Sequence, residues 1–370
     1  MNLDDILAKA EQEAALSNEE LQLLLELRRT EDLTKLFAVA RELRERYFGG
    51  KVFLYGFIYF STYCRNDCTF CLYRRSNHTL PRYRKPDAEI LAVAQRLTEA
   101  GVHLLDLTMG EDPLYVGRGS QGFDQLFQTV AAVKRSTGLP LMISPGVVPG
   151  EALRTFKEVG VDWYACYQET HNRTLYSQLR VGQSYAERME AKVAARRLGL
   201  LIEEGLLAGV GDEEKDVVQS LEAMRKLGAD QVRVMSFVPQ AGTPLEGHTT
   251  VSRARELATI AVMRLVFPDR LIPASLDVDG LAGLRQRLQA GANVVTSIIL
   301  PQAGLAGVSQ SSLDIEDGNR TVQAVRPVLA SLGLESASPA EYAAWVAART
   351  AANQNARGYG HTANVKRSTL

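Results

Sequence analysis

The sequence predicts an α/β fold, a (β/α)8 barrel of the TIM type with an N-terminal helical extension and a C-terminal tail. Three observations support this prediction. Eight short runs of β-branched and aromatic residues recur after residue 50, amphipathic stretches of helical length lie between them, and the pattern spans about 250 residues, the usual length of such a barrel. A doubly wound open sheet contains the same elements, and a strand count alone does not exclude it.

The residues before the first strand are predicted to be helical. Leucines recur at helical spacing after residue 20, and Ser17 with Glu20 fits a capping box that opens the second helix. Gly49 and Gly50 then end the helical segment.

Strand and helix candidates alternate along the rest of the chain. The candidate strands are 52–60, 103–109, 140–147, 162–169, 199–209, 230–239, 271–277 and 292–300. The candidate helices are 87–99, 122–136, 150–158, 184–198, 213–227, 251–266 and 279–289. We therefore divide the chain into a helical extension (1–50), a barrel (51–302) and a C-terminal helical segment with a tail that packs on or covers the barrel (303–370).

The composition is that of an ordinary globular protein. The chain has 370 residues, a formal net charge of −1 and 46% hydrophobic residues. Near-neutrality gives no electrostatic case for nucleic acid or an anionic membrane as the main partner. The acidic, amphipathic N-terminus is unlike a signal peptide, and no apolar run is long enough to span a bilayer. We expect a reducing, cytoplasmic location, because the cysteines do not form a disulfide framework.

Three of the four cysteines, Cys64, Cys68 and Cys71, cluster directly after the first predicted strand. Structural zinc sites use four ligands, usually in two separated pairs, and the fourth cysteine, Cys166, lies in a distant strand where we expect a core residue. A thioredoxin-like pair would leave Cys64 without a role. A cubane iron–sulfur cluster normally takes four thiolates, so three would bind three irons and leave the fourth open to another ligand.

This spacing, with Phe70 as the aromatic residue before the last cysteine, resembles the CxxxCxΦC signature of the radical S-adenosylmethionine (SAM) superfamily. The resemblance implies a [4Fe-4S] cluster held by the three cysteines, with SAM bound at the open iron. It also implies reductive cleavage of SAM to a 5′-deoxyadenosyl radical that abstracts hydrogen from a substrate. A loop at the carboxyl end of a barrel strand is where such a fold places its chemistry.

Later segments resemble the SAM-binding parts of the biotin synthase and [FeFe]-hydrogenase maturase branch. The stretch LTMGEDP contains Gly110 and Glu111, a partial match to a turn whose backbone receives the methionyl amino group. Glu169 ends the fourth strand and Arg188 follows in the next helix, a pair able to bind the ammonium and carboxylate of a methionine moiety. In LLAGVGDE, Gly209 permits backbone to approach an adenine closely.

Four strings are similar to the methylornithine synthase family of pyrrolysine biosynthesis. They are YGFIYFSTYCRNDCTFCLYRRSN, YQETHNRTLY, RVMSFVPQAGTPLEG and IPASLDVDGLAGLRQRLQAGANVVTSI, spread from about residue 52 to 300. The resemblance implies isomerisation of L-lysine to (3R)-3-methyl-D-ornithine by radical fragmentation and recombination.

Lysine carries two ammonium groups and one carboxylate, so a closed pocket for it needs about one cation and two anions. Strand ends supply such a set, which the family resemblance also implies. We assign Arg233 to the carboxylate, Asp277 with Ser275 to the α-ammonium and Asp112 to the distal ammonium, with the two aspartate roles exchangeable. Structural alternatives exist: an ion pair for Arg233, a helix cap for Asp277 and a turn for Asp112.

Two other functions remain open on the sequence. A hydrogenase-maturase-like enzyme would keep the SAM site and change the substrate, and it is favoured if Arg233 and Asp277 do not face the cavity. A non-catalytic iron–sulfur scaffold protein would bind metal without cleaving SAM. The basic loop 72–86 is a candidate contact for an electron donor such as flavodoxin or ferredoxin, although a solvated loop has the same composition.

Overall fold

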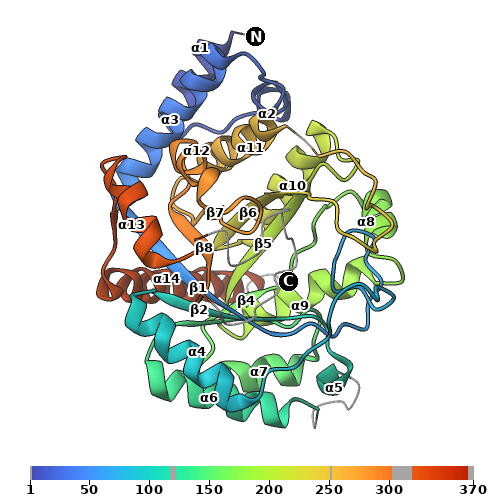
Figure 1. Ribbon diagram of the computed structural model, residues 1–370. Coiled ribbons are helices and arrows are strands. Elements are labelled where there is room, and N and C mark those ends of the chain that lie inside the picture. The colour runs from blue at the N-terminus through green and yellow to red at the C-terminus, as the bar shows by residue number, and fades with distance from the viewer. Residues whose placement is uncertain (1, 117–121, 251, 302–318, 366–370) are drawn as a thin grey trace.

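The computed structural model describes residues 2–116, 122–250, 252–301 and 319–365. Eight parallel strands follow one another around a nearly closed barrel in the order β6-β5-β4-β3-β2-β1-β8-β7 (Figure 1). The strands are β1 (Lys51–Ser61), β2 (Leu104–Met109), β3 (Leu141–Ser144), β4 (Trp163–Ala165), β5 (Leu201–Ala208), β6 (Gln231–Ser236), β7 (Pro273–Ser275) and β8 (Val294–Ile298). A single bridge between Gln231 and Leu271 joins β6 to β7. The predicted barrel is therefore confirmed and the open sheet is excluded.

Helices surround the strands (Figure 1). They are α4 (Asp87–Ala100), α5 (Pro113–Val116), α6 (Asp124–Thr137), α7 (Gly150–Glu158), α8 (Arg173–Leu179), α9 (Tyr185–Arg197), α10 (Glu214–Leu227), α11 (Arg253–Val266), the 3-10 turn η2 (Gly280–Ala282), α12 (Leu284–Gln289) and α13 (Val322–Ala330). Within the described ranges, none of the helices has both the length and the apolar character needed to cross a membrane.

Three helices precede the barrel: α1 (Leu3–Glu11), α2 (Asn18–Leu25) and α3 (Thr30–Phe48). The predicted capping box is present, because Ser17 accepts from the Glu20 backbone N–H while the Glu20 carboxylate accepts from that of Ser17. Gly49 ends α3 with a φ of 56°, a left-handed value that glycine adopts without strain. Helices α2 and α3 pack on α11, so the extension covers one side of the barrel (Figure 1).

Strand β1 shows how the sequence builds the two faces of the barrel wall. Its alternate residues Phe53, Tyr55, Phe57 and Tyr59 belong to the cluster inside the barrel. The residues between them, Val52, Leu54, Ile58 and Phe60, belong to the core between strands and helices. This period of two is the geometry of an extended strand, so one strand supplies both cores.

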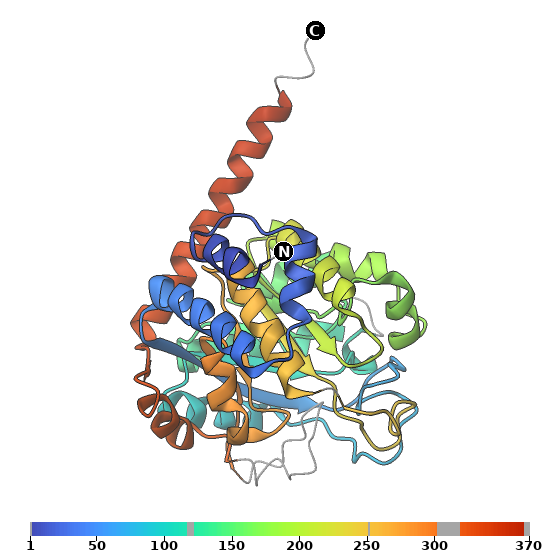
Figure 2. The same ribbon diagram turned by 90° about the horizontal axis from the view of Figure 1, so that it is seen from above.

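The C-terminal segment closes the end of the barrel at which the strands begin. The short strand β9 (Glu335–Ser336) pairs with the start of β1, and α14 (Pro339–Val365) follows it. Tyr342 of α14 is fully buried among the inward residues of β1. Helix α14 then extends away from the barrel (Figure 2), and it continues to Val365 within the predicted C-terminal segment.

Candidate active site

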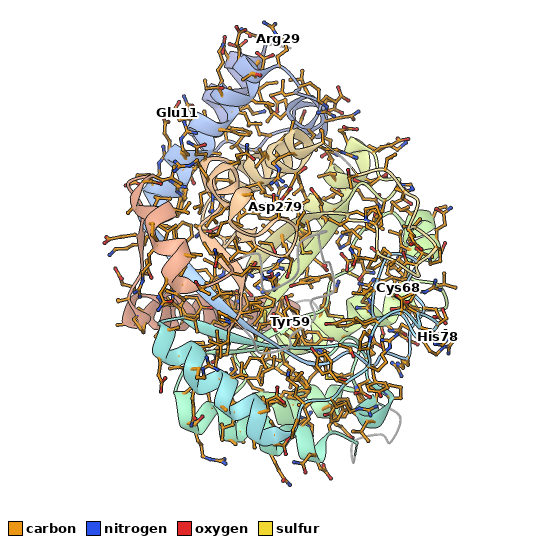
Figure 3. All side chains as sticks on the ribbon, viewed as in Figure 1. Glu11, Arg29, Tyr59, Cys68, His78 and Asp279 are labelled. Atoms are coloured by element: carbon orange, nitrogen blue, oxygen red, sulfur yellow. The ribbon has the colours of Figure 1, made fainter. Side chains whose placement is uncertain are left out.

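A cavity of about 180 Å³ opens at the carboxyl ends of the strands. Its wall includes most of the residues that the sequence singled out: Cys64, Cys68, Phe70, Cys71, Gly110, Glu111, Glu169, Arg188, Arg233 and Asp277. Gly209, Asp112 and Ser275 are not on the wall. In Figure 3, Cys68 lies among the loops beyond the strand ends, and Tyr59 lies closer to the centre of the ring of strands.

The cysteine loop follows β1 directly and is fixed by its own neighbours. Arg82 donates to four backbone carbonyls of the loop, those of Thr62, Tyr73, Arg74 and Asn77. The turn after β2 packs tightly against the loop, because a Cβ at Gly110 would collide with the Tyr63 carbonyl. Arg82, one residue of the basic run 72–86, therefore holds the loop in shape.

The three thiols have the chemistry that an iron–sulfur cluster needs. Burial raises the pKa of Cys64 to about 11 and raises that of Cys71 strongly, so a nearby cation is needed to hold these sulfurs as thiolates. In the part of the chain that the structure describes, no three His, Cys, Asp or Glu side chains converge on a single metal ion. In a cubane cluster each thiolate binds a different iron, and three thiols from one loop that line the same cavity are able to hold such a cluster.

Two ion pairs line the wall beside the cysteines. Arg188, from the first turn of α9, donates to Glu111 at 2.9 Å and to the Cys166 sulfur at 2.9 Å. Burial opposes ionisation of Glu111, but Arg188 and the Val147 N–H hold the pKa of that carboxyl below its usual value. Glu169 instead pairs with Arg180 at 2.8 Å. The predicted methionine contacts Glu169 and Arg188 are thus both on the cavity wall, each with a different partner.

Glu169 has a φ of 68°, which is unusual for a residue with a Cβ. Its N–H donates to the Gly205 carbonyl at 3.1 Å and its carbonyl accepts from the Leu207 N–H at 3.0 Å. These two hydrogen bonds to β5 hold the strained backbone of Glu169 in place, at the wall of the cavity. Strain of this kind is concentrated at functional sites.

Deeper in the cavity, Arg233 of β6 pairs with Glu203 of β5 at 2.8 Å, and Tyr167 donates to the same carboxylate at 2.8 Å. Nη2 of Arg233 is buried and has no hydrogen-bond partner among the described residues. On β2, Asp106 accepts from Ser144 at 2.9 Å through Oδ1, while Oδ2 is likewise buried and unpartnered in the described part of the chain. Burial, with Glu203 nearby, raises the pKa of Asp106 to about 7.

Asp277 also faces the cavity, but its carboxylate is already engaged. Arg320 binds it at 2.8 Å, Tyr59 donates to it at 2.8 Å and Ser297 at 2.7 Å. Ser275 donates to it at 3.3 Å, so this serine acts on the cavity through Asp277.

Asp112 and Gly209 have local roles in this structure. Asp112 is fully buried and receives two hydrogen bonds from Arg84, at 2.6 and 2.8 Å, and one from Ser61 at 2.6 Å. Gly209, with a φ of 92°, lies in the turn after β5, where its N–H donates to Asp212 at 2.6 Å. Two residues earlier, Leu207 lines the cavity.

Four wall or near-wall residues were missed by sequence reasoning: Asp106, Arg180, Glu203 and Arg320. Asp106 and Glu203 had a usable signal, because each is a charged residue inside an otherwise apolar strand candidate. Arg180 and Arg320 lie in connecting segments with no distinguishing pattern.

Comparison with known proteins agrees with this geometry. Residues 58–224 match the radical SAM superfamily. The chain is 45% identical to the 3-methylornithine synthase of Methanosarcina acetivorans over 327 residues, 88% of this chain and 92% of the relative. It is 31% identical to the [FeFe] hydrogenase maturase subunit HydE of Thermotoga maritima over 263 residues, 70% of this chain and 74% of that one.

Among solved structures, the crystal structure of methylornithine synthase (PylB) matches with a TM-score of 0.87 and 43% sequence identity, covering 92% of this chain and 99% of that chain. The structure of HydG, a maturase of the [FeFe]-hydrogenase, matches with a TM-score of 0.78 at 20% identity, which supports the shared fold alone. The chain therefore belongs to the radical SAM superfamily and, within it, to the methylornithine synthase family.

Proposed function

We propose that this protein isomerises L-lysine to (3R)-3-methyl-D-ornithine, using SAM and a [4Fe-4S] cluster held by Cys64, Cys68 and Cys71. The cluster and SAM supply the radical that starts the reaction. The residues of the chain bind the two small molecules, orient them and exclude water. The stereochemistry of the product follows from the family alone.

The balance of charge in the cavity carries the choice of lysine. The carboxylates with arginine partners at this end of the barrel include Glu111 with Arg188 and the half-exposed Arg65, Asp112 with Arg84, Glu169 with Arg180, Glu203 with Arg233 and Asp277 with Arg320. Asp106 has no ion pair among the described residues. Lysine has a net charge of +1, so an ionised Asp106 compensates it within the low-dielectric cavity.

The unpartnered atoms give lysine an orientation. Arg233 Nη2 is a free donor for the substrate carboxylate, and Glu203 and the Tyr167 ring hold its guanidinium in place. Asp106 Oδ2 is a free acceptor for an ammonium group. We therefore assign Asp106, rather than the Arg84-paired Asp112, to one ammonium. Asp277 with Ser275 serves the other ammonium, with its charge moderated by Arg320.

We assign Arg188 and Glu169 to the methionine carboxylate and ammonium of SAM. Both lie on the cavity wall beside the cysteine loop, and each has a partner that fixes its side chain. Gly110, Glu111 and Phe70 line the same cavity; Gly110 packs against the cysteine loop and Glu111 pairs with Arg188. Because Gly209 is not on the cavity wall, we reassign the adenine contact to Leu207 of β5, which lies two residues earlier and lines the cavity. A donor of the flavodoxin or ferredoxin type completes the proposed system.

Both alternative functions are less well supported. A hydrogenase-maturase-like function would be favoured if Arg233 and Asp277 faced away from the cavity. Both residues line the cavity, which favours lysine as the substrate. A scaffold protein has no need for a cavity that carries an uncompensated carboxyl group, that of Asp106.

The test is anaerobic reconstitution with iron, sulfide, reductant, SAM and lysine, followed by mass spectrometry and chiral chromatography of the product. We expect 5′-deoxyadenosine and methylornithine from the wild-type chain, and a fall in kcat/KM for lysine of about 100-fold in Asp106→Asn. Deoxyadenosine without a lysine isomer would disprove the proposed reaction. If Asp112→Asn rather than Asp106→Asn raises the KM for lysine, our placement of the ammonium is wrong.

A further inference from the structure

The connection between α8 and α9, residues 180–184, lies directly against the cysteine loop. The Thr69 N–H donates to the Leu179 carbonyl at 2.9 Å, which ties the two segments together through the backbone. Gly182, with a φ of 72°, lets the connection turn back between the two helices. This contact brings side chains of the connection to the most buried of the three cysteine ligands, Cys68.

Two donors converge on the Cys68 sulfur. Gln183 Nε2 lies 3.0 Å from it and Arg180 Nη1 lies 3.6 Å from it. The Gln183 amide cannot turn freely, because its Oε1 accepts from Arg188 Nη2 at 2.8 Å. The N–H side of the amide is therefore directed at the sulfur by a residue that we assign to SAM.

The same pattern holds for Arg180. Its Nη2 donates to Glu169 at 2.8 Å and to the Tyr167 carbonyl at 2.9 Å, which leaves Nη1 facing Cys68. Two short connections thus join the proposed methionine contacts to one sulfur: Arg188 through Gln183, and Glu169 through Arg180.

Hydrogen bonds to ligand sulfurs and nearby positive charge stabilise the more negative, reduced form of an iron–sulfur cluster, and so raise its reduction potential. We propose that Gln183, assisted by Arg180, is a positioning residue that raises the potential of the cluster and transmits SAM binding at Arg188 to the Cys68 sulfur. This role rests on the cluster and SAM parts of the proposed function, and it does not depend on lysine as the substrate.

The experiment is a potentiometric titration of the reconstituted full-length chain, followed by electron paramagnetic resonance, without lysine and in the presence or absence of SAM. Gln183→Leu keeps the size of the side chain and removes both amide contacts. We expect its equilibrium constant for one-electron reduction to fall about tenfold, a shift of about 59 mV to more negative potential. We also expect the change in potential on adding SAM to be smaller than in the wild type.

Gln178→Leu, on the exposed side of α8, is the matched control and should keep the wild-type potential. Gln183→Glu gives a second test, because a carboxylate still accepts from Arg188 but donates nothing to Cys68; its potential should also fall. Equal potentials in Gln183→Leu, Gln178→Leu and wild type would overturn the proposal. Loss of the cluster in both Gln183 variants would overturn it too, because a tuning donor is not needed to hold the cluster. If Gln183→Leu lowers the reduction potential as expected but the wild-type chain does not convert lysine, only the proposed lysine reaction would be disproved.

Discussion

The two ends of the barrel interior are built from the same strands in opposite ways. At the end where the strands begin, which we call the floor, aromatic rings of Phe53, Tyr55, Trp163, Tyr342 and Trp345 fill the space, and Trp163 stacks on Trp345 with ring centroids 6.0 Å apart. At the carboxyl end, the inward positions carry charged groups around the cavity. Because side chains of α14 fill the floor, a small molecule can bind only at the charged end of the described barrel.

The polar groups at the two ends also differ. On the floor, Tyr55 and Tyr342 share a hydrogen bond of 2.7 Å, and His103 accepts from the Leu54 N–H while bonding the Ala337 carbonyl, both at 2.8 Å. The floor also contains a buried donor without a partner among the described residues, Trp163 Nε1, but in the cavity such atoms include those of charged side chains, Asp106 Oδ2 and Arg233 Nη2. Satisfied polar groups stabilise a fold, whereas unsatisfied ones cost stability until a ligand binds them. Stability and binding should therefore respond separately to changes at the two ends.

The largest effect on stability is expected from Tyr342→Ala on the floor. It removes a fully buried ring from Phe53 and Tyr55, so the free energy of unfolding in denaturant should fall by about 3–5 kcal/mol. The KM for lysine should stay unchanged. Tyr342→Phe keeps the ring and loses the bond to Tyr55, so it should cost only about 1 kcal/mol. A Tyr342→Ala protein as stable as wild type would show that the floor is not a packed core.

The next largest effect is an increase in stability, expected from Asp106→Asn in the cavity. The pKa of Asp106 is raised from 3.8 to about 7, so the unfolded chain releases this proton first as the pH rises. The wild type should therefore lose stability between about pH 4 and pH 7, and the variant should lack this loss. Without ligand, the free energy of unfolding of the variant relative to that of the wild type should rise by about 3 kcal/mol between pH 4.5 and pH 8, measured by denaturant unfolding.

A constant difference between the two proteins across this pH range would contradict the raised pKa of Asp106. Together with the expected loss of lysine turnover, a stabilised variant would show that the uncompensated carboxyl is kept for binding at a cost to the fold.

The smallest effect is expected from His103 on the floor. Burial lowers its pKa from 6.5 to about 4, so its contribution to stability is full above pH 6.5 and is lost as the pH falls toward 4. Between pH 7 and pH 5.5 this contribution should fall by about 1 kcal/mol. His103→Gln removes the titration, so the stability difference between wild type and variant should shrink by this amount. A difference independent of pH would show that His103 stays unprotonated in both states or titrates normally in the fold.

The fold could be predicted from the sequence because its signals are local and repeated. Seven of the eight strands lie within their predicted ranges, and β1 exceeds its range of 52–60 by one residue at each end. The fourth was predicted to extend to residue 169 but ends at Ala165, since the chain turns away toward Glu169. The plugging of the floor could not be predicted in detail, because it depends on a contact between Tyr55 and Tyr342, separated by 287 positions.

The candidate site was predictable in part for the same reason. The cysteine spacing is a local signal, and all three cysteines line the cavity. Charge pairing is not local: Asp277 and Asp112 were chosen as free anions, and the structure pairs them with Arg320 and Arg84. A sequence shows the charges near a site but does not show which of them neutralise one another.

The position of Tyr342 in the chain has a consequence for synthesis on the ribosome. All eight barrel strands are complete by Ile298, yet the ring that fills the floor lies more than forty residues later. During translation the strands emerge first, at a rate of about 5–20 residues per second. For several seconds the nascent barrel has its catalytic end in place and its opposite end open, with aromatic side chains exposed to chaperones and to other chains. Docking of α14 onto the floor then buries these aromatic side chains.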